Sequence, residues 1–172
     1  MDEHRLGLQP VLKRVWWPIG LPCVAEVHPR YAWLWVSGFV QPDTGETFWY
    51  LTPTLNIAWF TLILAEFARA TGLGANKQVV LVLDGASFHR SEKVQLPVGI
   101  QLVQLPAYAP ELQPAEHLWS FTEQPVVNRV MQDMAHLADV VTQRCQVVRT
   151  LTDQSRAVTS FHWWPQGITS TA

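Results

Sequence analysis

Two carboxylates stand where catalytic groups gather in α/β proteins. Asp84 follows directly after the apolar run Gln78–Leu83 (QVVLVL), and Glu116 opens a predicted helix after a proline-rich stretch. In open α/β sheets, ligands and catalytic groups collect at the carboxyl ends of strands. Each residue also has a purely structural interpretation. Asp84-Gly85 is a common turn pair, and an acidic residue near a helix N-terminus contributes about 0.3–1 kcal/mol of stability.

Taken together, the two carboxylates indicate a site for a hard divalent cation. Mg²⁺ prefers oxygen ligands and usually takes only one or two protein carboxylates, together with waters and phosphate oxygens. Two such ions can activate an attacking oxygen and stabilise a leaving one when a phosphodiester bond is broken. Asp84 and Glu116 therefore predict phosphodiester chemistry that depends on Mg²⁺, with Mn²⁺ as a substitute.

The strands that must position these residues are predicted from local patterns. Tyr31–Val40 is rich in aromatic and β-branched residues, which is typical of a buried strand. A turn at Pro42–Gly45 then returns the chain into a second strand at Glu46–Leu51. The run Gln78–Leu83 is expected to be a central strand covered on both faces. Further strands are predicted at Arg14–Trp17 and Ile100–Leu105, and the start of the chain, with Arg5, Lys13 and Arg14, is predicted to be a loop.

Helical spacing of apolar residues predicts two long helices. The first spans Thr54–Thr71, with Thr54 as its N-cap and Gly72 as its end. The second spans Ala135–Leu151 and is expected to bury one stripe, namely Leu137, Val140, Val141, Val147 and Val148. Shorter helices are predicted at Ser91–Leu96 and Glu116–Phe121. This order of strands and helices favours an α/β sandwich with a mixed sheet.

Composition limits the class of protein. The chain has 172 residues, 48% hydrophobic and 15% charged, which suits one folded domain and excludes a disordered chain. Its most apolar stretch, Ile57–Ala65, is far shorter than the roughly 20 residues of a membrane-spanning helix. Two cysteines do not make a disulfide framework, so a reducing cytoplasm is expected. A net charge of −2 argues against tight nucleic-acid binding by bulk electrostatics alone.

Two segments carry a resemblance to a known family. Leu83–His89 (LDGASFH) and Leu105–Trp119 (LPAYAPELQPAEHLW) resemble the catalytic core of the DDE transposases of bacterial insertion sequences, in the mariner-like superfamily. In that family one strand delivers an Asp, followed by a small residue and then a His, and a later proline-rich stretch delivers the final Glu. The matching positions in the second segment are Tyr108, Pro110, Glu111, Leu112, Pro114, Glu116, His117 and Trp119.

The resemblance implies a ribonuclease H-like fold, with a mixed sheet flanked by helices, over residues 1–172. It also implies a third carboxylate on the first strand, where Asp2-Glu3 matches the family pattern. Asp2, Asp84 and Glu116 are then the catalytic triad and the ligands of Mg²⁺, with two ions expected when DNA is bound. Because Asp2 is the second residue, we expect little of the first strand to be present.

The resemblance also implies partners. These are DNA, both transposon ends and target, and a second copy of the chain in a homodimer. Relatives carry an N-terminal helix-turn-helix region that recognises transposon ends, and these 172 residues contain none. We therefore expect a separate or upstream helix-turn-helix segment to supply end recognition.

Four further residues have both a functional and a structural interpretation. His89 could contact the scissile phosphate or orient a water, or it could fix the loop after Asp84. His117 could support Glu116 or simply lie on a helix face. Lys13 and Arg14 could touch a DNA backbone or belong to a solvated face.

The sequence thus predicts a transposase catalytic domain that cleaves DNA strands and transfers them at transposon ends. Two alternatives stay open. One is an inactive remnant with only a structural or dimerising role. The other is a different ribonuclease H-like nuclease, such as a ribonuclease or a junction resolvase.

Overall fold

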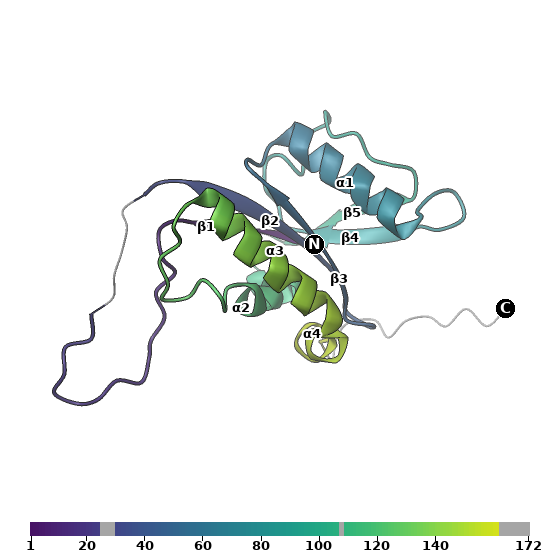
Figure 1. Cartoon of the computed structure of the whole chain (residues 1–172). Helices are drawn as coiled ribbons and strands as arrows, with labels where there is room; N and C mark the ends of the chain where they lie inside the picture. Colours follow the sequence, from purple (N-terminus) through teal and green to yellow (C-terminus); the bar gives the residue numbers. More distant parts are fainter. Residues whose placement is uncertain (25–29, 107–108, 162–172) are drawn as a thin grey trace.

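A computed structural model describes residues 1–24, 30–106 and 109–161, in which helices cover both sides of the strands (Figure 1). In that view α1 lies above the strands, and α2, α3 and α4 lie below them. The elements in chain order are β1 (Asp2–Gly7), β2 (Trp33–Gln41), β3 (Glu46–Thr52), α1 (Ile57–Thr71), β4 (Val79–Leu83), β5 (Ile100–Gln104), the 3-10 helices η1 (Pro110–Leu112) and η2 (Pro114–Leu118), α2 (Trp119–Thr122), α3 (Met134–Thr150) and α4 (Thr152–Thr159).

The strands form two hydrogen-bonded sheets. β1, β2 and β3 are antiparallel neighbours, in the order β1-β2-β3, and β4 pairs with β5 in parallel. The backbone nitrogen of Met1 donates to the carbonyl oxygen of Val82 at 2.7 Å, so the start of β1 lies against β4. The structure therefore contains both antiparallel and parallel strand pairs, as expected for a mixed sheet. The two sets of strands meet where Met1 bonds to β4.

β1 corrects two expectations. The start of the chain is a strand that includes Arg5, and it pairs with β2 over its whole length, from Asp2↔Gly38 to Gly7↔Trp33. The expectation that little of the first strand is present was wrong for the part that follows Asp2. The guanidinium of Arg5 lies 4.4 Å from the ring centre of Trp33 on β2, a cation–π contact between the two paired strands.

α1 covers one side of the sheets. Its N-cap is Asn56, whose side chain accepts from the backbone N–H of Trp59, and not the predicted Thr54. It ends at Gly72, as predicted, because φ is 66° there and glycine tolerates the left-handed region. Its buried face packs against strand residues in one apolar core, formed by Met1, Phe39, Phe60, Ile63, Leu64, Phe67, Ala68, Leu81, Leu83 and Ile100.

α3 packs on the opposite side and closes a second core. Its N-cap is Asp133, which accepts from the backbone N–H of His136. The buried stripe is Leu137, Val141, Cys145 and Val148. The predicted stripe was wrong at Val147, which is exposed. This core joins α3 to β1, β2 and Trp119. Trp119 begins α2 directly after η2, so the predicted helix Glu116–Phe121 is formed by the end of η2 and the start of α2.

Three other local predictions were wrong. Arg14–Trp17 forms no strand, since the segment protrudes and Trp16 is fully exposed. Ser91–Leu96 contains a turn and no helix. β4 is not covered on both faces, because Val80 is 55% exposed. The described helices contain none that is long and apolar enough to cross a membrane.

Candidate active site

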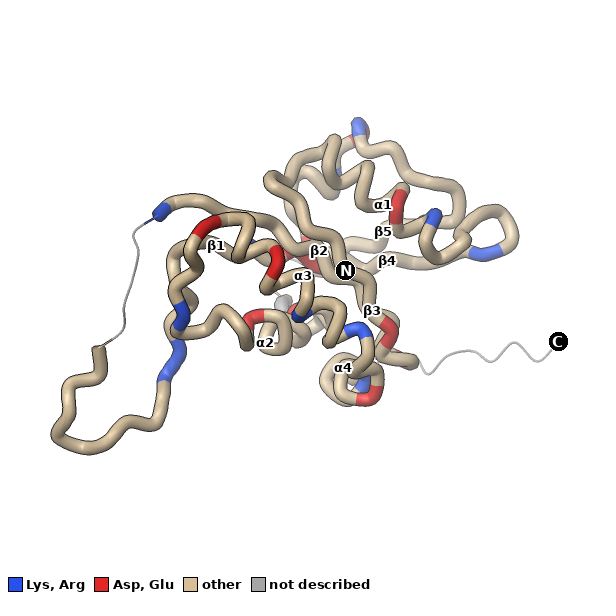
Figure 2. The backbone as a smooth tube through the Cα atoms, in the orientation of Figure 1, with Lys and Arg blue, Asp and Glu red and all other residues tan. Residues whose placement is uncertain are grey.

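A cleft of about 560 Å³ opens where the start of β1, the end of β4 and η2 meet. We call it the carboxylate cleft, because all three predicted triad residues line it. Acidic positions are visible beside the N-terminus in Figure 2, where β1 approaches β4. The lining residues are Asp2, Glu3, His4, Asp84, Gly85, Arg90, Leu105, Pro106, Ala109, Gln113, Glu116 and Trp119.

Asp2 is the first residue of β1 and is half-buried. Its Oδ2 accepts a hydrogen bond of 2.6 Å from the indole Nε1 of Trp119, which is itself buried. Burial raises the pKa of Asp2, and the negative charge of Glu3 raises it further. The carboxylate is thus held in a fixed place at an electrostatic cost, which a bound cation would relieve.

Asp84 stands immediately after β4, and its side chain is 57% exposed. Its Oδ1 accepts from the backbone N–H of Ala86 at 3.0 Å, which is the turn geometry expected from an Asp-Gly pair. The same oxygen lies 2.8 Å from Nδ1 of His89. The turn and the catalytic interpretation are therefore compatible, since the turn holds the carboxylate at the mouth of the cleft.

His89 connects Asp84 to a buried acid on β1. Its Nε2 lies 3.1 Å from Oε1 of Glu3, and the two side chains are only 1% and 5% exposed. Burial alone would lower the pKa of His89, but the hydrogen bond and charge of Glu3, together with Asp84, raise it overall. A doubly protonated ring can donate to Glu3 and Asp84 at once. This arrangement favours the interpretation of His89 as a residue that fixes the loop.

Glu116 lies in the first turn of η2 and is exposed. Burial raises the pKa of Glu116, and electrostatic repulsion from the negative charge of Asp2, which lines the same cleft, raises it further. Such a set of oxygen donors fits a hard cation. Among the described residues, no three Asp, Glu, His or Cys side chains are close enough to form a complete metal site. Mg²⁺ sites that take part of their ligands from substrate phosphates need no such complete cage.

Four predicted residues do not line the cleft: His89, which contacts Asp84 from beside it, and His117, Lys13 and Arg14, which lie farther out. His117 is exposed, and its ring lies 5.0 Å from that of Phe161. Lys13 pairs with Glu123 at 2.5 Å, and Arg14 is exposed on the same loop, where blue positions mark the segment in Figure 2. Tyr108, a motif position, falls outside the described residues.

Sequence reasoning did not anticipate Arg90 or Gln113 in the cleft, nor that the motif residue Trp119 contacts Asp2. Arg90 lines the cleft, and its guanidinium packs against Gly85, where a Cβ atom would collide with it. Gln113 is buried, and its amide donates to the carbonyl of Met1 at 2.8 Å. Trp119 holds Asp2. Gly85 beside Asp84 was the one available signal, since a glycine permits close approach of another group.

Comparison with known proteins shows the family of this chain. A family model described as DDE superfamily endonuclease matches residues 1–138. The chain belongs to this family. The uncharacterised protein y4pE/y4sA of Sinorhizobium fredii (strain NBRC 101917 / NGR234) is 33% identical over 123 residues, which cover 71% of this chain and 87% of that protein.

Solved structures of the Mos1 mariner transposase share the fold. The pre-cleavage Mos1 transpososome matches with a TM-score of 0.59 at 14% identity, over 94% of this chain and 55% of that one. The Mos1 paired-end complex with Mn matches with a TM-score of 0.58 at 12% identity, over 94% and 56%. This chain thus spans about half the length of those transposase chains. The ribonuclease H-like α/β fold is confirmed.

Proposed function

We propose that this chain is the catalytic domain of a transposase that cleaves DNA strands at transposon ends and transfers them to target DNA. The observation that carries the proposal is the carboxylate cleft. Asp2, Asp84 and Glu116 line it from three separate elements, and the chain belongs to the DDE superfamily endonucleases. The reaction is hydrolysis of a phosphodiester bond at the transposon end. Attack of the freed 3′-hydroxyl on target DNA follows.

Asp2, Asp84 and Glu116 are the residues that would hold Mg²⁺, or Mn²⁺ in its place, with two ions when DNA is bound. The bound cation supplies activation of the attacking oxygen and charge neutralisation at the leaving oxygen. The chain's own residues position the ligands: Trp119 fixes Asp2, and His89 fixes Asp84. Crystal structures of the Mos1 mariner paired-end complex contain Mn in one case and Mg in another, which supports this choice of cation.

DNA is the proposed substrate and partner. Arg90 is the one Lys or Arg among the cleft-lining residues that the structure describes, so it is the group that would meet a phosphate there. The net charge of −2 argues against tight or selective DNA binding by these 172 residues through bulk electrostatics. We therefore propose that a separate or upstream helix-turn-helix segment recognises the transposon ends, and that the protein works in the cytoplasm, where bacterial DNA lies.

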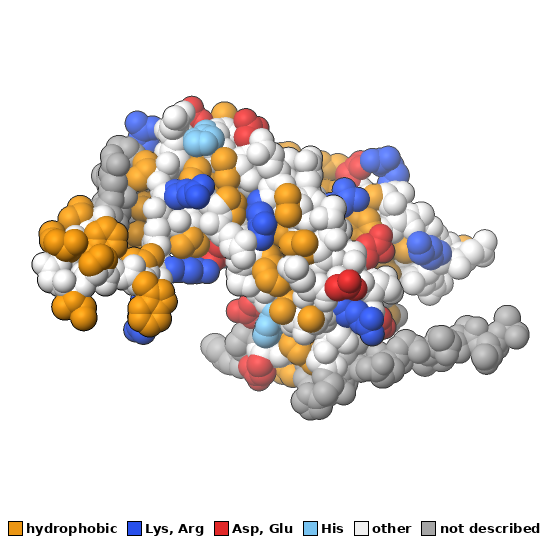
Figure 3. Space-filling view, turned by 60° about the horizontal axis from the view of Figure 1, so that its bottom comes forward, with side chains coloured by type: hydrophobic (Ala, Val, Ile, Leu, Met, Phe, Trp, Pro, Cys, Tyr) orange, Lys and Arg blue, Asp and Glu red, His pale blue; other side chains and the backbone are white. Residues whose placement is uncertain are grey.

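A second copy of the chain is the proposed protein partner. The loop between β1 and β2 exposes a row of large apolar side chains, and an apolar patch protrudes at the left of Figure 3. Trp16 and Ile19 are fully exposed. Apolar surfaces of this kind mark protein–protein contacts. The described members of the row are Leu12, Val15, Trp16, Trp17, Ile19, Leu21 and Val24.

Cleavage assays with matched variants test the proposal. We expect the wild-type chain to nick supercoiled plasmid with Mn²⁺ and to cleave duplexes that carry transposon ends. Asp84→Asn and Glu116→Gln should abolish both activities while leaving the fold intact. Glu111→Gln is the control, because Glu111 belongs to the same motif and does not line the cleft.

Three results would contradict the proposal. Retained cleavage in Asp84→Asn or Glu116→Gln would show that the chemistry lies elsewhere. A preference for RNA–DNA hybrids or four-way junctions would identify a different ribonuclease H-like nuclease. No cleavage of any substrate by the folded wild-type chain would identify an inactive remnant.

A further inference from the structure

Two tryptophans on β2 belong to neither apolar core. Trp33 and Trp35 alternate along the strand with Leu34 and Val36, which are buried in the core that α3 closes. Since alternate residues of a strand point to opposite faces, the two tryptophans project to the α1 side of the sheet. Each is half-buried, and neither is a member of the core beneath α1.

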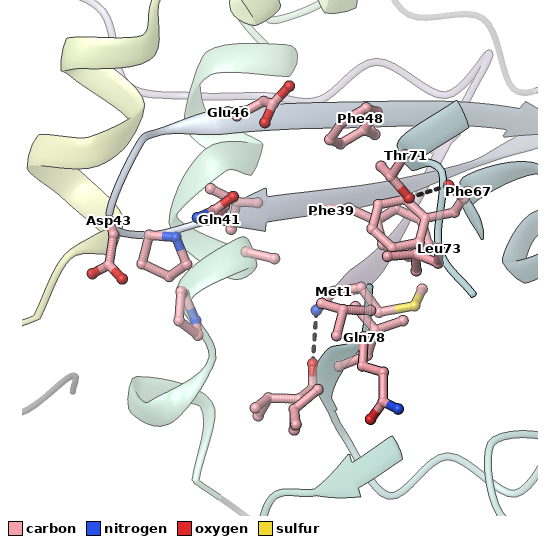
Figure 4. Close-up of a pocket in the computed structure, with 18 of the residues that line it drawn as sticks. Met1, Phe39, Gln41, Asp43, Glu46, Phe48, Phe67, Thr71, Leu73 and Gln78 are labelled. Carbon is pink, nitrogen blue, oxygen red and sulfur yellow. Dashed lines mark hydrogen bonds between the residues drawn. The ribbon is translucent and has the colours of Figure 1, made fainter. Parts of the chain in front are cut away.

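α1 covers only the far end of this face of β2. Phe39, four residues beyond Trp35, stacks on Phe67 of α1 with ring centres 4.2 Å apart. Phe39, Phe48 and Phe67 stand together at a cavity of about 440 Å³ (Figure 4), and neither tryptophan lines it. In Figure 1 the start of β2 extends to the left beyond α1. Trp33 and Trp35 therefore occupy the part of this face that α1 does not cover.

Arg5 lies against both tryptophans. It pairs with Trp35 across the strands, and its guanidinium is 4.4 Å from the ring centre of Trp33 and 5.9 Å from that of Trp35. A Cβ atom on Gly7 would come within 2.2 Å of Cε3 of Trp33, so the indole of Trp33 lies close over the backbone of β1. We call Arg5, Trp33 and Trp35 the tryptophan platform.

The polar groups of the tryptophan platform are unused by the protein. Among residues 1–24, 30–106 and 109–161, Arg5 forms no ion pair with an acidic side chain. Within the same ranges the indole N–H groups of Trp33 and Trp35 donate to no acceptor, whereas that of Trp119 donates to Asp2. A guanidinium offers five N–H donors and each indole offers one. The platform thus combines aromatic surface with free donors and one positive charge.

We propose that the tryptophan platform binds unpaired nucleotides of single-stranded DNA. Bases stack on aromatic rings whatever their sequence, and guanidinium groups pair with phosphates. The bases would stack on the indoles of Trp33 and Trp35, and Arg5 would donate to a phosphate beside them. Stacking does not depend on bulk charge, so a net charge of −2 does not oppose it. The choice of DNA as the ligand rests on the proposed function.

The tryptophan platform lies beside the carboxylate cleft along β1. Glu3 and His4 line the cleft, and Arg5 follows them directly. Successive strand residues rise about 3.4 Å, so Arg5 stands about 7 Å beyond Glu3 on the same face of β1. At about 3.4 Å per nucleotide, a strand leaving the cleft in this direction would reach the platform within about two nucleotides. The platform is thus placed to hold unpaired DNA that flanks the bond to be cut.

Fluorescence anisotropy with a labelled twelve-nucleotide oligothymidylate tests the proposal. EDTA is present throughout, so cleavage plays no part. We expect the wild type to bind this single strand more tightly than a duplex of the same length. Trp33→Leu and Trp35→Leu should each weaken binding at least about fivefold, through loss of one stacked base. Arg5→Gln should flatten the logarithmic salt dependence by about 0.7, the value of one phosphate on a single strand.

The matched control for Arg5→Gln is Arg149→Gln. Arg149 is an exposed cation near the end of α3, which packs on the opposite side of the sheet. It should leave both the affinity and the salt dependence unchanged, although it removes the same charge. Equal effects of the two variants would show bulk attraction and overturn the proposal.

Photocrosslinking locates the contact without any variant. Oligothymidylate with one base replaced by 5-iodouracil is irradiated on the wild-type chain, and fragment mass spectrometry identifies the attached residue. We expect the attachment at Trp33 or Trp35. Attachment only elsewhere, or tighter binding of the duplex than of the single strand, would overturn the proposal.

Two further outcomes distinguish the possible occupants and functions. A dimer that is lost in Trp33→Leu, with DNA affinity unchanged, would assign the tryptophan platform to a second copy and overturn the proposal. Neither DNA measurement uses cleavage, so each claim can fail by itself. A wild-type chain that binds single strands at the platform and cuts no substrate would refute the proposed function alone. A chain that cuts DNA and binds no single strand would refute this inference alone.

Discussion

The buried pair between Glu3 and His89 leads to a sharp prediction for Glu3→Gln. The two side chains are 5% and 1% exposed, so neither can be solvated if its partner fails. Removing one member of a buried ion pair outright costs about 3–5 kcal/mol. Glutamine keeps an oxygen acceptor for Nε2 of His89 and loses only the charge. We therefore expect the free energy of unfolding to fall by about 1–3 kcal/mol, the value of a hydrogen bond to a charged group.

The matched control is Glu66→Gln. Glu66 pairs with Arg69 at 2.6 Å on the surface of α1, and the two side chains are 44% and 75% exposed. Exposed pairs contribute about 0–1 kcal/mol. Urea unfolding of the wild type and both variants gives the comparison directly. Equal costs for Glu3→Gln and Glu66→Gln would refute the claim that the Glu3–His89 pair is buried and intact.

The pH dependence of the difference adds an independent check. The folded-state pKa of His89 is raised, so the stabilisation it provides is fully present below its ordinary pKa of about 6.5. That stabilisation is lost as pH rises through the folded-state value. The gap in stability between wild type and Glu3→Gln should thus be widest near pH 6 and narrow in alkaline solution. A gap that widens as pH rises would contradict the assignment of a charged His89.

Three further predictions concern the cleft and the loop. Asp2→Asn should stabilise the metal-free chain by about 0.5–2 kcal/mol at neutral pH, since the raised pKa of Asp2 means that its charge is disfavoured there. This gain should vanish as pH falls through the folded-state pKa, and stability equal to wild type at every pH would contradict it. Arg90→Ala should weaken DNA binding and flatten its salt dependence by about one phosphate contact, measured by fluorescence anisotropy at several salt concentrations, and an unchanged salt slope would exclude that contact. The double change Trp16→Ser and Ile19→Ser should shift the chain toward monomer in sedimentation experiments without lowering its unfolding midpoint; an unchanged dimer population would exclude the loop as the interface.

The parts of the fold that were predictable depend on local signals. Gly72 ends α1 and the Pro42–Gly45 turn joins β2 to β3, because both need backbone conformations that glycine supplies. The place of Asp84 directly after β4 was predictable, because an apolar run followed by Asp-Gly marks a strand end. The place of Glu116 in the first turn of a helix was predictable, because Pro114 fixes where that helix starts.

The parts that were not predictable depend on distant contacts. No local pattern shows that Glu3 meets His89, or that Trp119 reaches Asp2, because these pairs form only after β1 lies beside β4. The Arg14–Trp17 segment has the composition of a strand, yet within residues 1–24, 30–106 and 109–161 no strand pairs with it. The N-cap moved from Thr54 to Asn56 because Asn56 stands three residues before a free backbone N–H, that of Trp59.

Binding of Mn²⁺ in the carboxylate cleft tests the central claim most directly. Crystals soaked in high Mn²⁺ and measured at an anomalous-scattering wavelength would locate the ion, and the high concentration offsets the missing phosphate ligands. We predict a peak between Asp84 and Glu116, with Asp2 at its edge, that disappears in Asp84→Ala. A cleft without a peak, or a peak that survives in Asp84→Ala, would contradict the assignment of these carboxylates as a catalytic metal site.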